Sequence, residues 1–363
     1  MLEERPDRPR KGRGAVSNRS GRYEAVAHVA VSDGWETAAH ERDDPPPETH
    51  VARDHSRRVI ARNNSPDVPF DRSINPYRGC EHGCVYCFAR PTHAWLGLSP
   101  GLDFETRLFA KPDAPELLRA ELAAPGYRPA TLALGTSTDP YQPIERELGI
   151  TRRLLEVLYE TRHPVTIVTK SPLVVRDLDL LVPLARENLA GVFVSVTTLD
   201  RDLARRMEPR AATPKRRLAA IAELSAAGVP AGVLAAPMIP ALNDAELERI
   251  LEAAAAAGAS AAGYVLLRLP LEIKELFEEW LEAHYPERKA RVLKLVRETR
   301  GGRLYDAAWG RRMKGEGVYA ELLKARFALA SRRLGLGRPD WDLDASAFRR
   351  PAKPADPNQL RLF

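Results

Sequence analysis

The sequence predicts an α/β fold in which a parallel sheet is covered by helices on its outer side. Between Asn75 and Pro270, short β-branched or aliphatic runs alternate with amphipathic segments. This alternation is typical of βα units, which build a parallel sheet that is closed or partly closed as a barrel. The expected strands are Thr131–Leu134, Val165–Thr169, Gly191–Thr197, Pro230–Ala235 and Tyr264–Leu267.

Helices are expected between these strands, at Thr151–Thr161, Pro214–Ala227 and Asp244–Ala257. Glycine stands at or near the ends of the last two, as is typical of helix termination. In a βα barrel, functional side chains lie at the carboxyl ends of the strands. The residues that follow each strand are therefore the first candidates for a functional site.

Composition limits the class of protein. The chain has 363 residues, of which 44% are hydrophobic; this suffices for one large core and excludes a disordered or fibrous protein. No apolar run approaches the roughly 18 residues that a membrane span needs. The N-terminus MLEERPDRPRKGRG is charged where a signal peptide is apolar. We therefore expect a cytoplasmic protein.

Four segments are predicted along the chain. Residues 1–72, rich in Arg, Pro, Asp and Ser, form an irregular N-terminal arm, and residues 73–270 form the α/β core. Residues 271–338 form a helical C-terminal extension, and residues 339–363 form a flexible, Pro-punctuated tail. Residues 286–363 hold 19 Lys and Arg against nine Asp and Glu. This basic region indicates either a polyanionic partner or a solvated helical surface.

The most specific motif contains the only three cysteines, Cys80, Cys84 and Cys87, in a C-x3-C-x2-C spacing. Such close neighbours do not form a disulfide framework, so metal ligation is the leading interpretation. Three thiolates on one loop bind three irons of a 4Fe-4S cubane and leave the fourth iron without a protein ligand. Gly79 and Gly83 suit a backbone that turns closely around such a cluster. The alternative is a structural zinc site completed by His82 or His93.

From Asn75 through Pro270 the sequence resembles the radical S-adenosylmethionine (SAM) superfamily, in particular the group related to spore photoproduct lyase. The resemblance rests on the cysteine motif and on the later segments G-T-S-T-D (135–139), V-T-K (168–170) and M-E-P-R (207–210). It implies a partial (β/α)6 barrel, a 4Fe-4S cluster and SAM as cofactors, and an external electron donor. It implies an enzyme that cleaves SAM reductively to a 5′-deoxyadenosyl radical.

The resemblance also implies cofactor-binding residues. Thr138 matches the position near the SAM amino group, and Lys170 matches the lysine that contacts the SAM carboxylate, which suits an ammonium facing an anion. Ser195 and Thr197 match polar positions near the ribose, and Arg216 is a further predicted contact. No catalytic residue is assigned.

One departure from the family pattern bears on the reaction. Spore photoproduct lyase uses an additional cysteine as hydrogen-atom donor, and the corresponding residue here is Thr136. Because an aliphatic O–H bond is far stronger than a thiol S–H bond, Thr136 does not replace that donor. Either a tyrosine such as Tyr141 or Tyr264 donates the hydrogen atom, or the substrate and reaction differ. Glu145 is interpreted as a carboxylate at the rim of the site or as a helix cap.

Two features outside the core point to partners. The basic groups Arg5, Arg8, Arg10, Lys11, Arg13 and the run Arg311–Gly317 predict contact with a nucleic acid backbone, or else a solubilising arm and a helix connection. The terminal peptide QLRLF resembles the pentapeptide by which bacterial proteins dock on the DNA sliding clamp, with contacts from Gln359, Leu360, Leu362 and Phe363. Its alternative is an apolar terminus that folds back on the body.

Three functions are therefore considered. The first is a radical SAM enzyme that acts on nucleic acid, in DNA repair or modification. The second is a radical SAM enzyme that acts on a peptide or a small molecule. The third is a zinc-stabilised adaptor that binds nucleic acid or the clamp and has no enzymatic activity.

Overall fold

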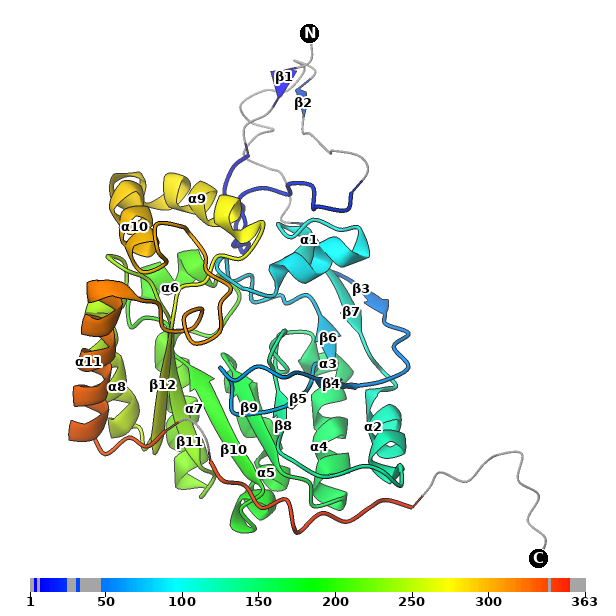
Figure 1. Ribbon diagram of the computed structural model, residues 1–363. Coiled ribbons are helices and arrows are strands. Elements are labelled where there is room, and N and C mark those ends of the chain that lie inside the picture. The colour runs from blue at the N-terminus through cyan, green and yellow to red at the C-terminus, as the bar shows by residue number, and fades with distance from the viewer. Residues whose placement is uncertain (1–2, 5–6, 25–30, 33–46, 339–340, 353–363) are drawn as a thin grey trace, which may run out of the picture.

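Six parallel strands and one antiparallel edge strand form the central sheet of the computed structural model, which describes residues 3–4, 7–24, 31–32, 47–338 and 341–352 (Figure 1). The strand order is β12-β11-β10-β9-β8-β5-β4, and only the β4–β5 pair is antiparallel. The bounds of these strands are β4 Ile60–Arg62, β5 Arg72–Ile74, β8 Leu132–Leu134, β9 Val165–Thr169, β10 Ala190–Ser195, β11 Ala231–Met238 and β12 Ala261–Leu266.

The parallel sheet confirms the predicted partial (β/α)6 barrel. All five predicted strands are present, with ends that differ by up to three residues. The sixth parallel strand of the expected (β/α)6 barrel is β5, which ends at Ile74, before the loop around Cys80. With only three residues, Arg-Ser-Ile, this strand is too short and too polar to produce a recognisable strand pattern in the sequence.

Two smaller sheets lie outside the barrel. One consists of β3, β7 and β6, and the other is the antiparallel pair of β1 and β2. Most described residues of the predicted N-terminal arm are irregular, but β3 and β4 tie it to folded parts of the chain. The bounds are β1 Glu3–Glu4, β2 Val31–Ser32, β3 His50–Arg53, β6 Tyr77–Arg78 and β7 Arg107–Ala110.

Helices cover the outer face of the sheet, and further helices lie beside the carboxyl ends of its strands (Figure 1). The outer helices are α2 Ala114–Ala123, α4 Ile150–Glu160, α5 Leu178–Arg186, α7 Pro214–Ala226, α8 Leu247–Ala256 and α11 Gly317–Arg333. The others are α1 Asp103–Thr106, α3 Glu145–Leu148, α6 Arg201–Met207, α9 Ile273–His284 and α10 Pro286–Glu298, with 3-10 turns η2 Arg90–Leu96, η3 Pro172–Asp177 and η4 Asp244–Glu246.

Local signals explain the helix ends. Pro214 occupies the first turn of α7, where its missing N–H costs no hydrogen bond. After α7 the chain turns at Gly228 in the left-handed region (φ +82°), and the N–H of Val229 donates to the carbonyl of Leu224. The glycine that suggested this helix end in the sequence therefore terminates it in the structure.

Strand side chains alternate between an outer core and the barrel interior. Val165 and Ile167 of β9 pack in the core formed with the outer helices, whereas Thr166 and Val168 are partly exposed on the opposite face. In β10, Val192 and Val194 belong to the same outer core. Because side chains alternate along a strand, Ser195 on β10 faces the interior.

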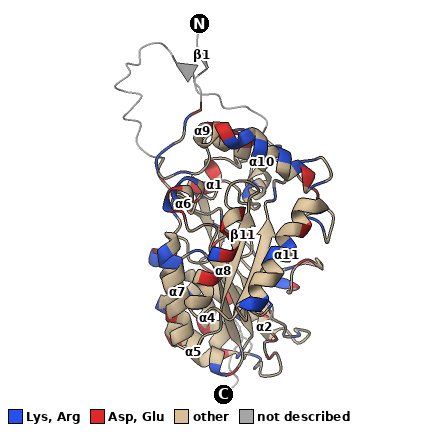
Figure 2. Ribbon diagram, turned by 90° about the vertical axis from the view of Figure 1, so that its left-hand side faces the viewer, with Lys and Arg blue, Asp and Glu red and all other residues tan. Residues whose placement is uncertain are grey.

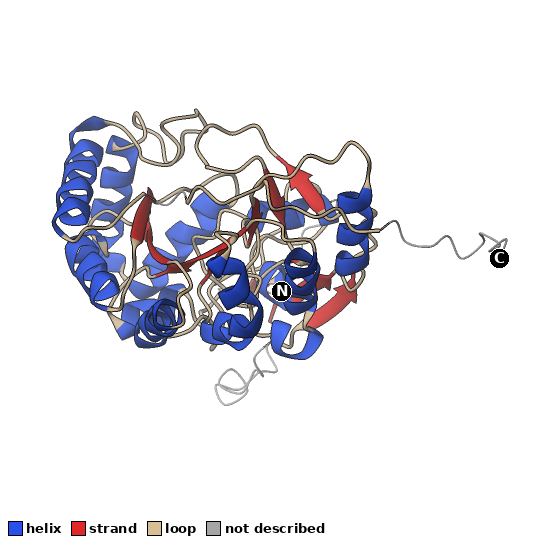
Figure 3. Ribbon diagram, turned by 90° about the horizontal axis from the view of Figure 1, so that it is seen from below, coloured by secondary structure: helices blue, strands red, loops and turns tan. Residues whose placement is uncertain are grey.

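The chain after α11 returns along the N-terminal ends of the strands (Figures 1 and 3). Trp341 stacks on Phe193 with ring centroids 4.2 Å apart. The N–H groups of Asp344 and Arg349 donate to the carbonyls of Asn188 and Thr161 at 2.9 and 2.7 Å. This segment therefore supports the end of the barrel opposite the predicted site.

None of the helices in the described part of the chain combines the length and the apolar character needed to cross a membrane.

Candidate functional site

The three cysteines lie on one loop between β6 and η2, at the carboxyl side of the sheet. All three are free; Cys80 and Cys84 are buried, and Cys87 is partly exposed. Consecutive turns shape the loop: the N–H groups of Gly83, Cys87 and Arg90 donate to the carbonyls of Cys80, Cys84 and Cys87 at 3.1 to 3.3 Å. The loop therefore gathers three thiols at the end of the barrel where function is expected.

Both glycines of the loop are required by its geometry. Gly79 and Gly83 have φ angles of +77° and +66°, which side chains rarely tolerate. A Cβ atom on Gly79 would lie 2.8 Å from the carbonyl oxygen of Phe104, and one on Gly83 would lie 2.7 Å from Oε2 of Glu105. The crowding comes from α1, so the loop is pressed against the protein on its outer side.

Burial raises the pKa of the Cys80 and Cys84 thiols. For Cys80, the carboxylate of Asp139 and the other two cysteines raise it further. For Cys84, the ammonium of Lys170 opposes the effect of burial. Three adjacent thiols in such a place become thiolates only when positive metal charge compensates them. Because an iron-sulfur cluster supplies this charge through separate irons, the loop fits one.

The predicted zinc alternative lacks its fourth ligand. His82 is buried with Nδ1 3.3 Å from Oδ2 of Asp139, and Nε2 of His93 lies 3.0 Å from the carbonyl oxygen of Arg107. Both imidazoles thus have partners other than the cysteines, and no metal-binding group among the described residues joins either histidine to the three thiols. The arrangement therefore does not favour a mononuclear zinc site.

Thr138 and Asp139 connect the loop after β8 to the cysteine loop. The hydroxyl of Thr138 donates to the carbonyl of Gly79 at 2.7 Å. Asp139 accepts hydrogen bonds from the hydroxyl of Thr169 and the backbone N–H of Lys170, both at 2.7 Å. Burial would raise the pKa of Asp139, but His82 and these donors hold it at about 2. Asp139 therefore joins the ends of β8 and β9 to the cysteine loop as an anion, a role that the sequence did not indicate.

Lys170 lies between the cysteine loop and the barrel interior. It follows β9 in phase with the inward-facing Thr166 and Val168, so it continues their face. Its Nζ atom is 5.9 Å from the ring centroid of Tyr86, the aromatic residue just before Cys87. The predicted carboxylate-binding residue is thus beside the predicted cluster ligands.

Ser195 and Thr197 belong to a buried polar network. Both hydroxyls donate to the carbonyl of Ala236, at 3.2 and 3.1 Å. The Thr197 hydroxyl also lies 2.6 Å from Oε1 of Glu208, and Tyr86 donates to the same carboxylate. The network places Ser195 and Thr197 beside the cysteine loop and the M-E-P-R segment.

The structure does not bring Arg216 to this network. Arg216 is exposed on α7, whereas Arg217 is buried, pairs with Glu208 and donates to the carbonyl of Ser195 at 3.1 Å. Consecutive residues point about 100° apart around a helix. The residue that reaches the network is therefore Arg217, one position after the predicted Arg216. The sequence does not distinguish these two arginines, because the rotation of α7 against the sheet decides which of them is buried.

Neither tyrosine suggested as a hydrogen-atom donor faces the interior. The hydroxyl of Tyr141 is buried against Asp177 at 3.1 Å. Tyr264 packs in the outer core, 4.7 Å from the ring of Phe327 on α11. Thr136, at the position of the missing cysteine, accepts a hydrogen bond from the side-chain amide of Asn75 at 3.1 Å.

Glu145 is a helix cap and not a rim carboxylate. It is fully buried and accepts the backbone N–H groups of Thr151 and Arg152 at 3.0 and 3.3 Å. Tyr77 and Arg176 complete its shell. Of the two interpretations of this residue, the capping interpretation is correct.

The basic side chains of the run Arg311–Gly317 form ion pairs and hydrogen bonds within the chain. Arg311 pairs with Asp306 at 3.2 Å, and Arg312 pairs with Asp67 at 2.5 Å. Nζ of Lys314 donates to the carbonyl of Tyr264 at 2.6 Å, and burial lowers its pKa to about 8. Figure 2 shows both signs of charge over the outer helices of one face. The prediction that this run follows a phosphate backbone is therefore not supported by its geometry.

The structure describes only some of the predicted N-terminal cations and none of the predicted terminal peptide. Arg5 and the predicted clamp-binding peptide, residues 359–363, lie outside the described residues. Arg10 and Lys11 are exposed, whereas Arg13 is buried and donates to the carbonyl of Glu105 at 3.0 Å. Of these three described cations, Arg13 thus belongs to the folded body, whereas Arg10 and Lys11 lie at the surface.

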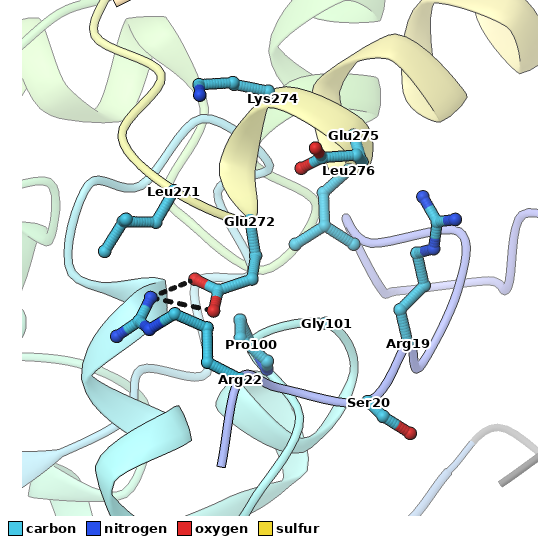
Figure 4. A pocket seen from close by; sticks show the side chains of 10 residues that line it. All are labelled: Arg19, Ser20, Arg22, Pro100, Gly101, Leu271, Glu272, Lys274, Glu275 and Leu276. Atoms are coloured by element: carbon cyan, nitrogen blue, oxygen red, sulfur yellow. Dashed lines mark hydrogen bonds and ion pairs between the residues drawn. The ribbon is translucent and has the colours of Figure 1, made fainter. Parts of the chain in front are cut away.

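A cavity of about 470 Å³ lies between the N-terminal arm, Pro100 and Gly101, and the start of α9, and contains none of the predicted site residues (Figure 4). Arg22 crosses it to Glu272 at the start of α9, with two contacts of 2.7 Å. Its other lining residues are Arg19, Ser20, Pro100, Gly101, Leu271, Lys274, Glu275 and Leu276.

Comparison with known proteins places these observations in a family. A protein-family model described as "Radical SAM superfamily" matches residues 74–254 of the chain. The uncharacterized protein Rv2578c of Mycobacterium tuberculosis is 39% identical over 236 residues, which cover 64% of this chain and 69% of that protein.

Two solved structures show the same fold. Spore photoproduct lyase complexed with dinucleoside spore photoproduct is 17% identical, with a TM-score of 0.56 and coverage of 79% of this chain and 80% of the other. A variant of that lyase with bound AdoMet and dinucleoside spore photoproduct is 16% identical, with a TM-score of 0.55 and coverage of 80% and 81%.

Proposed function

The chain belongs to the radical SAM superfamily, and from this we propose that Cys80, Cys84 and Cys87 hold its 4Fe-4S cluster and that the neighbouring strand ends bind SAM. Members of this superfamily are enzymes that require both cofactors. When bound, the reduced cluster supplies the electron that cleaves the sulfonium bond of SAM and releases a 5′-deoxyadenosyl radical.

The observation that carries this proposal is the gathering of three buried or half-buried thiols beside Lys170 at the carboxyl end of the sheet. Three cysteine ligands leave one iron open to the amino and carboxylate groups of SAM. The Lys170 ammonium binds the SAM carboxylate, because an anion there gains a charge-assisted hydrogen bond. Thr138 orients the amino group, while Ser195 and Thr197 face the ribose.

Metal analysis tests the cluster directly. We expect a brown protein with about four iron and four sulfide per chain after anaerobic purification. Replacing Cys80, Cys84 and Cys87 with alanine removes both iron and the broad visible absorbance. Stoichiometric zinc without iron in the unaltered protein would reject the cluster.

For the substrate we propose nucleic acid, in DNA repair or base modification. The support is the likeness of fold to spore photoproduct lyase, whose complexes contain a dinucleoside photoproduct. The described residues contain no cysteine besides the three of the cluster motif, so a thiyl route like that of the lyase does not operate. We therefore propose a reaction other than thiol-dependent thymine-dimer reversal.

Release of 5′-deoxyadenosine distinguishes the substrates. The assay compares no added substrate, undamaged DNA, ultraviolet-irradiated DNA and alkylated DNA, with dithionite as reductant. A strong increase with one DNA sample supports a nucleic acid substrate. An identical rate in all samples instead favours the second candidate, a peptide or small-molecule substrate, for which the internal pairing of Arg311 and Arg312 is the structural argument.

We further propose a cytoplasmic enzyme that uses an external electron donor and docks on the DNA sliding clamp through Gln359, Leu360, Leu362 and Phe363. A short peptide at the end of a Pro-rich segment binds a partner without moving the barrel. Deleting residues 359–363 is expected to abolish co-purification with the clamp while iron content and SAM cleavage remain unchanged. Clamp binding by the deleted protein would contradict the proposal.

A further inference from the structure

Residues 13–17 of the N-terminal arm are buried against the cysteine loop. Val16 packs in the apolar cluster that contains Cys84 and Tyr86, although these lie 68 and 70 positions after it in sequence. Gly14 passes so close to the loop that a Cβ atom there would lie inside the contact distance of the carbonyl oxygen of Gly83. An N-terminal segment thus forms part of the wall around the three thiols.

A fully buried ion pair joins this segment to the loop. Arg90 and Glu105 are both 0% exposed and pair with each other. The carboxylate of Glu105 accepts the backbone N–H groups of Gly14 and Ala15 at 2.9 and 2.8 Å. Removal of one partner from such a pair leaves an uncompensated buried charge. The two side chains are therefore strongly held in place.

Arg90, the partner of Glu105, binds the backbone of the cysteine loop. Its guanidinium donates to the carbonyls of Gly83 and Cys84 at 3.1 and 2.8 Å. It also donates to the carbonyls of Pro100 and Gly101 at 3.1 and 2.8 Å. One arginine therefore fixes the backbone of the cysteine loop, and its carboxylate partner fixes the N-terminal segment over it.

The segment is anchored at both ends. On one side, Arg13 donates to the carbonyl of Glu105 at 3.0 Å and to the hydroxyl of Thr49 at 3.2 Å; Thr49 in turn donates to Glu81 in the cysteine loop at 3.1 Å. On the other side, Arg22 forms the bidentate pair with Glu272 that crosses the cavity in Figure 4. These anchors keep residues 13–17 against the loop.

We infer that residues 13–17 are a strap that positions the cluster-binding loop through Glu105 and Arg90 and shields the cluster from oxygen and water. This inference rests on the proposed function, because it requires a cluster at Cys80, Cys84 and Cys87. The packing around a metal centre controls its solvent access and its redox potential. Lifting the strap opens the loop on the side where Gly14 now excludes solvent.

The test replaces Gly14 with alanine and compares it with Gly126→Ala. The backbone of Gly14 is not in the left-handed region, so the substitution acts only through its Cβ atom, which must push the strap away from Gly83. Gly126 is likewise outside the left-handed region and has nothing within 4 Å of an added Cβ. Each protein is loaded with iron and sulfide anaerobically, and the loss of visible absorbance on exposure to air is followed.

We expect Gly14→Ala to lose its cluster absorbance several-fold faster than the unaltered protein and Gly126→Ala to lose it at the unaltered rate. The electron paramagnetic resonance spectrum of the reduced cluster should shift in Gly14→Ala alone, because the loop backbone moves. A Gly14→Ala protein that bleaches at the unaltered rate with an unchanged spectrum overturns the inference.

A second variant keeps the test decisive if Gly14→Ala does not fold, as judged by circular dichroism. Arg13→Ala removes the contacts of the strap with Glu105 and Thr49 without adding volume, and it should also bleach several-fold faster. Equal bleaching of Arg13→Ala and the unaltered protein would refute the strap. If the unaltered protein itself binds no iron, the proposed function fails instead, so the two failures are distinguishable.

Discussion

Lys170 is the cation that we propose to bind the carboxylate of SAM. It continues the inward face of β9 and approaches Tyr86 and Cys84. Replacing Lys170 with methionine keeps the length of the side chain and removes its charge. Because a hydrogen bond to a charged group contributes about 1.5 to 3 kcal/mol, we expect SAM affinity to fall about 10- to 100-fold.

Equilibrium binding of SAM to the anaerobic protein measures this change. Iron content should be unchanged in Lys170→Met, which separates loss of SAM from loss of the cluster. The control is Arg216→Gln, since Arg216 is exposed on α7. A large loss of affinity in the control, or none in Lys170→Met, would show that the carboxylate is bound by another residue.

At the scale of elements, α4 depends on a single buried carboxylate. Glu145 accepts the N–H groups of Thr151 and Arg152, which the first turn of α4 leaves without helical partners, and it pairs with Arg176 on η3 at 2.9 Å. Glu145→Gln replaces an anion by an amide that cannot accept all these donors. We expect the free energy of unfolding to decrease by about 3 kcal/mol.

Urea unfolding followed by circular dichroism measures the effect of Glu145→Gln. Glu147→Gln is the matched control, because Glu147 is exposed on the same short helix. The free energy of unfolding of Glu145→Gln should be lower than that of Glu147→Gln by most of the expected decrease. If they unfold at the same urea concentration, the cap does not stabilise α4 as we infer.

At the scale of the whole molecule, His163 makes stability depend on pH. It is fully buried, with Nε2 2.7 Å from the hydroxyl of Tyr127 and Nδ1 3.0 Å from the carbonyl oxygen of Pro164. Burial lowers its pKa from 6.5 to about 4. Between about pH 6.5 and pH 4, His163 is therefore protonated in the unfolded chain but stays neutral in the folded chain. Stability is complete above about pH 6.5 and decreases by up to about 3 kcal/mol as the pH falls toward 4.

Unfolding free energies at pH 7 and pH 5.5 test this dependence. His163→Gln should lose less stability between the two pH values than the unaltered protein, since it no longer takes up that proton. His55→Gln, at an exposed position, should retain the unaltered dependence. An equal loss in all three proteins would remove His163 as the cause.

The sequence by itself determined the features that are written in short patterns. The alternation of runs and amphipathic segments predicted five parallel strands and the helices between them, and the glycine after α7 marked its end. The C-x3-C-x2-C spacing predicted a metal-binding loop, because three thiols within eight residues lie close together whatever the rest of the chain does. These signals depend on neighbours in sequence, so the sequence is sufficient to read them.

Only the tertiary structure decided the contacts between distant residues. Whether Arg216 or Arg217 reaches Glu208 depends on how α7 is rotated against β10, and a shift of one residue reverses the answer. For Glu145 and Arg312 the sequence allowed both a functional and a structural interpretation, and the internal partners that packing gives them favour the structural one. The strap at residues 13–17 had no signal at all, because burial against Glu105 and Gly83 exists only once segments about 70 to 90 residues apart are packed together. Such contacts depend on the free energy of the whole fold, which no local pattern records.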